Sequence, residues 1–184
     1  MPPTVTTVLS LDDVRLAGRT VLYRVDVNSP LEPSTGAFLD DSRLRSTLDT
    51  LRDLSDAKVV IMGHQSRPGK DDFTGMEVHC DRLSRLLGQT IRFVADVCGD
   101  DAITAIEEMQ PGEKIFLNNV RMHSEEYGPD KVSLEEEPSS EIVTRLSAIA
   151  DVYVSDAFGA AHRNSPTLTG FAEEMPCIAG RLMN

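Results

Sequence analysis

The stretch Thr20–Pro30, TVLYRVDVNSP, constrains the fold of this chain more than any other. Its first residues are apolar, β-branched and aromatic, as is typical of a buried strand. The run ends in Asp26, Asn28 and Pro30, residue types that do not continue a central strand. Because ligands of open parallel sheets bind outside the carboxyl ends of the strands, we expect Asp26 and Asn28 to lie where a ligand is held. An Asx turn that only caps the strand is the alternative interpretation.

Apolar runs and amphipathic segments alternate along the rest of the chain. Further buried strands are predicted at Lys58–Met62, Ile91–Val94, Lys114–Leu117 and Asp151–Val154. Helices are predicted from a cap at Asp41 or Ser42 through Leu54, and at Val78–Leu87, Ala102–Met109 and Ile142–Ile149. Such alternation is typical of βαβ units. We therefore expect one α/β domain over residues 1–184, a doubly wound parallel sheet in a three-layer, Rossmann-like α/β/α arrangement.

Four segments fall outside this alternation. We expect a short helical turn at Leu11–Leu16 that ends at Gly18, and a hairpin or surface loop at Leu31–Asp41. Ser124–Pro138 is predicted to be a polar, acidic loop, and His162–Asn184 a series of loops and short helices.

The net charge of −12 argues against nucleic acid and anionic membranes as partners. No apolar run approaches the ~20 residues of a membrane span. The first ten residues, MPPTVTTVLS, lack the basic flank and apolar core of a secretion signal, so we expect a cytoplasmic protein. Lysine is rare, at 4 of the 18 basic residues, and Asp outnumbers Glu by 17 to 13. This composition resembles that of proteins from salt-rich cytoplasms, with an ordinary acidic domain as the alternative.

The three cysteines, Cys80, Cys98 and Cys177, are odd in number and widely spaced. This pattern predicts neither a disulfide framework nor a zinc site. His79 beside Cys80 is therefore interpreted as a helix residue, and we expect no metal in this chain.

Polar or basic residues follow four of the predicted strands. They are Asp26 and Asn28, His64 and Arg67, Asn119 and Arg121, and Asp156 with His162 and Arg163, while Arg43 follows the loop after the first strand. Four arginines gathered at one edge of a sheet would repel each other unless an anion lay between them. The planar guanidinium group suits phosphate and carboxylate. The sequence therefore predicts an anion site at this edge.

Two further observations bear on this site. The chain has no G-x-G-x-x-G after the first strand and no G-x-x-x-x-G-K-[ST] motif, so no nucleotide loop is recognisable. Arg24 lies within the first strand, and we expect it to be a buried, paired ion rather than a ligand contact.

Five motifs, YRVDVNSP, DDSRLR, MGHQSRP, LNNVRMH and SDAFGAAHR, occur in this order and resemble the N-terminal half of the phosphoglycerate kinase family. The resemblance extends from about Thr20 to Asn184. It implies a glycolytic transferase that moves a phosphoryl group reversibly between ATP and the carboxylate of 3-phosphoglycerate, giving 1,3-bisphosphoglycerate and ADP. Together with the composition, it suggests a halophilic archaeal source.

The resemblance also implies a domain organisation. Residues 1–184 would be the N-terminal domain, which binds 3-phosphoglycerate or 1,3-bisphosphoglycerate, and the C-terminal domain that binds Mg-ATP or Mg-ADP is absent. We expect this chain to be a monomer, to bind no cofactor and to be inactive without its partner, the missing domain.

Residues that match the family's motifs acquire roles from the resemblance. Asp26 and Asn28 would hold the backbone and hydroxyl group of 3-phosphoglycerate. A basic patch would surround its 3-phosphate, formed by His64, Arg67, Arg121 and Arg163. Arg43 would be the catalytic residue, reaching toward the carboxylate and the phosphoryl group in transit.

The chain departs from the family's usual motifs at five positions. Gly63, Gln65 and Ser66 stand where the family commonly reads S-H-L-G-R-P, Asn118 replaces the Glu of E-N-L-R, and Ser155 replaces the Asn of N-D-A-F-G. No cation of the patch is lost. We expect altered geometry around the site, above all at Ser66, where a glycine would have more backbone freedom.

The implied reaction needs no general base, because the attacking carboxylate is already deprotonated at neutral pH. Phosphoryl transfer then depends on positioning and charge stabilisation, which a set of cations supplies. Two other interpretations stay open. A phosphohydrolase of haloacid dehalogenase type also places an Asp after the first strand, although Asn28 stands where its general acid would be. The other is a stand-alone anion-binding module.

Overall fold

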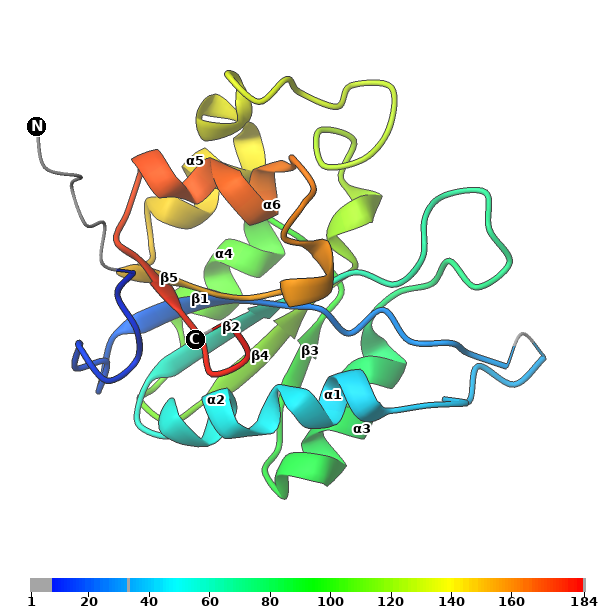
Figure 1. The fold of residues 1–184 in the computed structure, drawn as a ribbon, viewed down its shortest axis with the longest axis horizontal. Coiled ribbons are helices and arrows are strands. Elements are labelled where there is room, and N and C mark those ends of the chain that lie inside the picture. Colours follow the sequence, from blue (N-terminus) through cyan, green and yellow to red (C-terminus); the bar gives the residue numbers. More distant parts are fainter. Residues whose placement is uncertain (1–7, 33, 184) are drawn as a thin grey trace, which may run out of the picture.

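A six-stranded parallel sheet forms the centre of the computed structural model (Figure 1). The structure describes residues 8–32 and 34–183, so residues 1–7 of the N-terminal segment discussed above lie outside the described residues, as do Pro33 and Asn184. The strands are β1 (Thr20–Val25), β2 (Lys58–Met62), β3 (Arg92–Val94), β4 (Lys114–Leu117), β5 (Val152–Asp156) and β6 (Cys177–Ala179). Their order across the sheet is β3-β4-β2-β1-β5-β6.

Helices cover both faces of the sheet. On one face pack α1 (Ser42–Ser46), α2 (Leu48–Asp53) and α3 (Glu77–Leu87), and on the other lie α4 (Asp100–Glu107), α5 (Glu141–Ser147) and α6 (Pro166–Thr169) (Figure 1). The short 3-10 turns are η1 (Val120–Met122), η2 (Glu137–Ser139), η3 (Phe158–Ala160) and η4 (Gly170–Glu173). Alternate side chains of β1 enter opposite cores, Tyr23 on the side of α1–α3 and Leu22 on the other. The three-layer, Rossmann-like α/β/α fold expected from the sequence is confirmed.

The central strand β1 positions the site. All six of its residues are buried, and it pairs with β2 on one side and β5 on the other. Burial on both faces explains why its sequence is an apolar run rather than an alternation. The chain leaves β1 over one face of the sheet and leaves β5 over the opposite face, so the carboxyl ends of these neighbours form the switch point at which ligands of such sheets bind.

The predicted helical turn at Leu11–Leu16 is wrong. The carboxylate of Asp13 accepts a hydrogen bond from the backbone N–H of Ser10 at 2.8 Å, a local bond that competes with helix formation. Ser10 instead pairs with Ala179 beside β6, so this segment extends the edge of the sheet.

Two other local predictions need correction. The helix expected from Asp41 to Leu54 is two helices, α1 and α2, because the hydroxyl of Thr47 donates to the carbonyl of Leu44 at 2.8 Å and bends the backbone there. The segment predicted to contain only loops and short helices also contains β6, a three-residue strand. The remaining strands and helices lie close to their predicted positions, and α3 ends at Gly88 in the left-handed conformation.

Candidate functional site

A cavity of about 430 Å³ at the carboxyl edge of the sheet has a wall rich in arginine. Arg24 on β1, Arg121 in η1 and Arg163 after η3 contribute guanidinium groups, and His64 after β2 contributes an imidazole. Within the described residues, none of these three guanidinium groups forms an ion pair with a carboxylate. A larger groove of about 710 Å³, between residues 37–41 and α3, shares no lining residue with this cavity.

His64 is a neutral hydrogen-bond donor rather than a cation. Its Nδ1 lies 3.3 Å from Nη2 of Arg24, and because arginine only donates, Nδ1 accepts and the proton resides on Nε2. Burial first, and then the nearby charges of Arg24, Arg121, Arg163 and Arg43, lower the pKa of His64 to about 2. His64 therefore contributes a neutral N–H donor, and no positive charge, to the predicted basic patch.

The expectation that Arg24 is an ion-paired residue is wrong for the described part of the chain. Its side chain is fully buried, with Nη1 donating to the carbonyl of Val25 at 2.5 Å and Nε donating to the hydroxyl of Thr167 at 3.0 Å. These acceptors are neutral, so Arg24 has no direct carboxylate partner at the cavity wall among the described residues. An arginine inside an apolar strand, two residues before Asp26, was the signal for this role.

Two contacts hold the guanidinium of Arg121 in the cavity wall. Its Nη1 donates to the carbonyl of Ser66 at 2.5 Å, and its guanidinium lies 5.2 Å from the centre of the Tyr127 ring. Burial, followed by the charges of Arg163 and Arg24, lowers the pKa of Arg121. The crowding of these guanidinium groups favours an anion between them.

Asp26 and Arg43 lie together at the carboxyl ends of β1 and β5. Nη1 of Arg43, on α1, forms an ion pair with Oδ2 of the buried Asp26. A Cβ on Gly159, which follows β5, would meet the same oxygen, so a larger residue there would displace the Asp26 carboxylate from its present position. Arg43 does not line the cavity, although its charge acts on His64.

Asn28 connects the loop after β1 to the loop after β2. Its Oδ1 accepts a hydrogen bond at 2.7 Å from the backbone N–H of Ser66. Ser66 has φ of +56°, the left-handed region that glycine adopts readily. Its hydroxyl donates to Asp72 at 2.5 Å, and its carbonyl accepts from Arg121. The departure at Ser66 thus keeps the glycine-like backbone and adds side-chain bonds that hold it.

Gln65, another departure, is a buried bridge between the same two loops. Its side-chain amide donates to the carbonyl of Ser29 at 3.0 Å and accepts from the N–H of Ser29 at 3.1 Å. Nε2 of His79 also donates to Gln65, at 3.0 Å. His79 lies on α3, as expected, and no cluster of three potential metal ligands occurs among residues 8–32 and 34–183.

The other departures act on the backbone around the site. A Cβ at Gly63 would lie 2.9 Å from Cγ2 of Val27, so the serine common in the family would need a shift here. Oδ1 of Asn118 accepts from the N–H of Asn119 at 2.8 Å. Ser155 accepts from Gly180 at 2.9 Å through its backbone carbonyl, a bond that does not depend on its side chain.

Arg67, predicted as part of the basic patch, lies outside the cavity, as do the predicted site residues Asp26, Asn28 and Arg43. It is exposed, it is not part of the cavity wall, and its side chain has no hydrogen bond within the described residues. By contrast, Asn119 is buried and donates at 2.8 Å to the carbonyls of both Gln65 and Thr74. Asn119 thereby fixes the start of the loop that carries Arg67.

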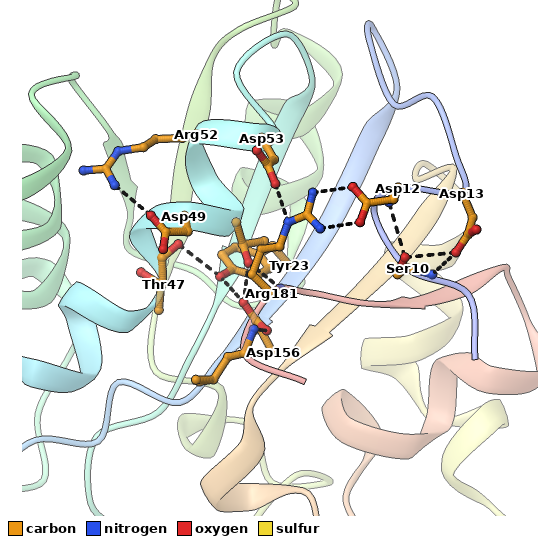
Figure 2. Close-up of polar contacts among 12 residues, drawn as sticks. Ser10, Asp12, Asp13, Tyr23, Thr47, Asp49, Arg52, Asp53, Asp156 and Arg181 are labelled. Atoms are coloured by element: carbon orange, nitrogen blue, oxygen red, sulfur yellow. Dashed lines mark hydrogen bonds and ion pairs between the residues drawn. The ribbon is translucent and has the colours of Figure 1, made fainter. Parts of the chain in front are cut away.

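Asp156, grouped with the strand-end residues by its position in the sequence, points away from the cavity. Its carboxylate accepts from the hydroxyl of Tyr23 at 2.8 Å, the hydroxyl of Thr50 at 2.6 Å and the N–H of Leu182 at 2.8 Å (Figure 2). The neighbouring Arg181 pairs with Asp12 and Asp53. Asp156 therefore anchors the segment after β6 and is not a ligand group.

The acidic loop after η1 contributes residues that sequence reasoning missed. Glu126, Tyr127 and Lys131 all line the cavity. Glu126 lies in the predicted polar, acidic loop but is only 3% exposed. In the local sequence, only Lys131, a single lysine among acidic residues, indicated that this loop lines the cavity.

The chain matches the family model "Phosphoglycerate kinase" over residues 11–184. It is 46% identical to the phosphoglycerate kinase of Methanothermobacter thermautotrophicus and 44% identical to that of Methanocorpusculum labreanum, in each case over 95% of this chain and 42% of the relative. The chain thus spans about two fifths of the length of these relatives.

Solved structures agree with these relatives. The phosphoglycerate kinase of Pyrococcus horikoshii superimposes with a TM-score of 0.90 at 39% identity, over 95% of this chain and 43% of that one. The enzyme of Coxiella burnetii gives 0.73 at 25% identity, over 96% and 42%. No helix in the described residues is long and apolar enough to span a membrane.

Proposed function

Since the chain belongs to the phosphoglycerate kinase family, we propose that it supplies the 3-phosphoglycerate site of a two-domain phosphoglycerate kinase. Residues 1–184 form the N-terminal domain in this proposal, and Mg-ATP or Mg-ADP binds to a C-terminal domain outside the sequence. The observation that carries the proposal is the arginine-rich cavity, in which Arg24, Arg121 and Arg163 lie without carboxylate partners among the described residues. A small ligand with a phosphate group supplies the missing charge.

The reaction proposed for the whole enzyme is a phosphoryl transfer between two oxygen atoms. A carboxylate oxygen of 3-phosphoglycerate attacks the γ-phosphorus of ATP, the bond to the β-phosphate oxygen breaks, and ADP leaves with that electron pair. The product is the mixed anhydride 1,3-bisphosphoglycerate. Magnesium would neutralise phosphate charge on the nucleotide, and the cationic cavity of this chain is not suited to hold it. This chain's own task is to bind, orient and stabilise charge.

The proposed roles follow the positions of the side chains. Arg121, Arg163 and the Nε2–H of His64 bind the 3-phosphate at the cavity, and the exposed side chain of Arg67 joins them by a change of its own rotamer. Asp26 and Asn28 receive the hydroxyl group and backbone. Arg43, now paired with Asp26, turns to the carboxylate and the phosphoryl group in transit.

We expect this chain to fold alone and to bind 3-phosphoglycerate with a Kd of about 0.1–1 mM, because an open site leaves one face of the anion hydrated. ATP should bind more weakly and without saturation. Titration followed by NMR is the test, with shifts expected near Asp26, His64, Arg121 and Gly159. Arg163→Ala should abolish them, whereas Arg52→Ala, an exposed arginine on α2, should leave them unchanged. Tighter, saturable ATP binding or turnover by the chain alone would refute the proposal.

The same proposal decides between the rival functions. A dehalogenase-type phosphatase does not agree with the family, and Asn28 is engaged with Ser66. A stand-alone anion-binding module would bind 3-phosphoglycerate equally well but stay inactive when joined to a nucleotide-binding domain of the family. We expect the fusion of this chain with that domain to catalyse turnover.

We further propose a monomer in a salt-rich cytoplasm, on the basis of the acidic, lysine-poor composition. Molar KCl should raise the midpoint of thermal unfolding, because salt screens repulsion between surface carboxylates. Melts in low salt and in molar KCl measure this effect. A midpoint that stays the same or falls in KCl would remove the halophilic source from the proposal.

A further inference from the structure

Glu126 is a buried carboxylate in the wall of an otherwise cationic cavity. Its oxygens accept three hydrogen bonds, from the hydroxyl of Ser165 at 2.8 Å, the N–H of Thr167 at 2.9 Å and the hydroxyl of Thr167 at 2.6 Å. All three donors are neutral. Within the described residues, Glu126 forms no ion pair, although cationic groups line the same cavity.

The hydroxyl of Thr167 connects Glu126 to Arg24 through two hydrogen bonds. A hydroxyl group has one proton, and here it is given to the carboxylate, which can only accept. The oxygen of Thr167 is therefore left as an acceptor, and Nε of Arg24 donates to it at 3.0 Å. We call this directed chain of hydrogen bonds the Glu126–Thr167–Arg24 relay.

The relay continues to His64. Nη2 of Arg24 lies 3.3 Å from Nδ1 of His64, and Nη1 donates to the carbonyl of Val25. All three guanidinium nitrogens of Arg24 are thus engaged, so the orientation of the group is fixed. Because Arg24 occupies Nδ1, the imidazole keeps its proton on Nε2.

Glu126 also holds the backbone segment that follows Arg163 in place. Ser165 and Thr167 come two and four positions after this arginine, and both are bound to Glu126. The carboxylate therefore fixes two walls of the cavity, one from β1 and one from the segment between η3 and α6.

We propose that Glu126 and Thr167 are positioning residues of the site: through the Glu126–Thr167–Arg24 relay they orient Arg24 and hold His64 as an Nε2–H donor toward the bound phosphate. This role rests on the proposed function, since the phosphate is that of 3-phosphoglycerate. Neither residue touches the ligand. Their effect reaches it through Arg24, His64 and the segment that carries Arg163.

Thr167→Val and Thr167→Ser form the central test. Valine keeps the shape but removes the hydroxyl, so Nε of Arg24 loses its acceptor and the buried carboxylate loses a donor. We expect the Kd for 3-phosphoglycerate, measured by calorimetry on this chain, to rise about tenfold with valine and less than about twofold with serine. Thr169→Val is the matched control, because that hydroxyl also binds a glutamate, Glu137, which does not line the cavity.

A second measurement reports on the relay whether or not ligand binds. The ¹⁵N shifts of His64 should show the Nε2–H form in the unaltered chain, and the Nε–H signal of Arg24 should be protected from solvent exchange. Thr167→Val and Glu126→Gln should both shift these signals, and Thr169→Val should not.

The outcomes separate the two proposals. No binding by the unaltered chain refutes the proposed function, whatever the relay does. If that chain binds but Thr167→Val binds equally well, or if Thr169→Val weakens binding as much, the relay is refuted. Should Thr167→Val fail to fold, an Nδ1–H form of His64 or a rapidly exchanging Arg24 Nε–H in the unaltered chain refutes it directly.

Discussion

Arg43→Ala in the intact two-domain enzyme that we propose is expected to lower kcat by about 10²-fold or more, as the loss of a preorganised charge at a transition state typically does. The guanidinium of Arg43 is half-exposed on α1 and is held by the buried carboxylate of Asp26 at the carboxyl end of β1. This ion pair keeps the guanidinium at the site before substrate arrives, and it turns to the ligand there. Arg43→Lys should not restore full activity, because an ammonium group lacks the planar fork.

Steady-state kinetics on the intact enzyme measure this effect, and Arg45→Ala is the matched control. Arg45 lies on the same helix but is paired with Asp41, so its loss should leave kcat unchanged. If Arg43→Ala raised KM alone and kcat survived, Arg43 would be a ground-state anchor and its catalytic role would be wrong.

The second large effect is on stability in acid. His64 and His79 have pKa values lowered by burial to about 2 and about 4, whereas a histidine in the unfolded chain has a pKa of about 6.5. Between pH 6.5 and 4, the unfolded chain therefore binds more protons than the folded one. Stability is full above pH 6.5 and falls as the pH drops through this window, by about 2 to 3 kcal/mol for each histidine at pH 4.5.

Urea unfolding at pH 7 and pH 4.5 measures the loss, about 5 kcal/mol in total. His79→Gln should remove about half of the pH dependence, and His162→Gln, at an exposed position, should leave it unchanged. A free energy of unfolding that is flat across this range would show that the buried imidazoles are protonated in the folded chain.

The central strands could be predicted because a strand that is buried on both faces is apolar along most of its length. β1, β2 and β4 are apolar runs bounded by polar residues, and each pairs with neighbours on both sides. β6 was missed because a three-residue edge strand leaves almost no pattern. The break at Thr47 depends on one hydroxyl bond to Leu44, which leucine spacing does not reveal.

The site was predictable to the extent that it follows strand ends. The parallel-sheet rule placed His64, Arg121 and Arg163 at one edge, and the structure brings them to one cavity. It did not reveal that burial makes His64 neutral or that Arg67 lies outside the cavity. These properties depend on side-chain environment and loop conformation, which residue spacing does not encode.

The roles of Arg24, Glu126 and Thr167 were missed because their contacts join residues that lie far apart in the sequence. Arg24 and Thr167 are 143 positions apart, and Glu126 is 41 positions from Thr167. The sequence predicted only a polar, acidic loop around Glu126 and did not reveal which of its carboxylates is buried. The structure shows that one of its carboxylates is enclosed by α6 and the segment before it.

The measurement that tests the central claim most directly is a crystal structure of this chain with 3-phosphoglycerate at a concentration well above its Kd. We expect the phosphate within hydrogen-bonding distance of Arg121, Arg163 and Nε2 of His64, and the carboxylate on the side of Arg43. A ligand in the groove between residues 37–41 and α3, or an unoccupied cavity at saturating ligand, would contradict the account.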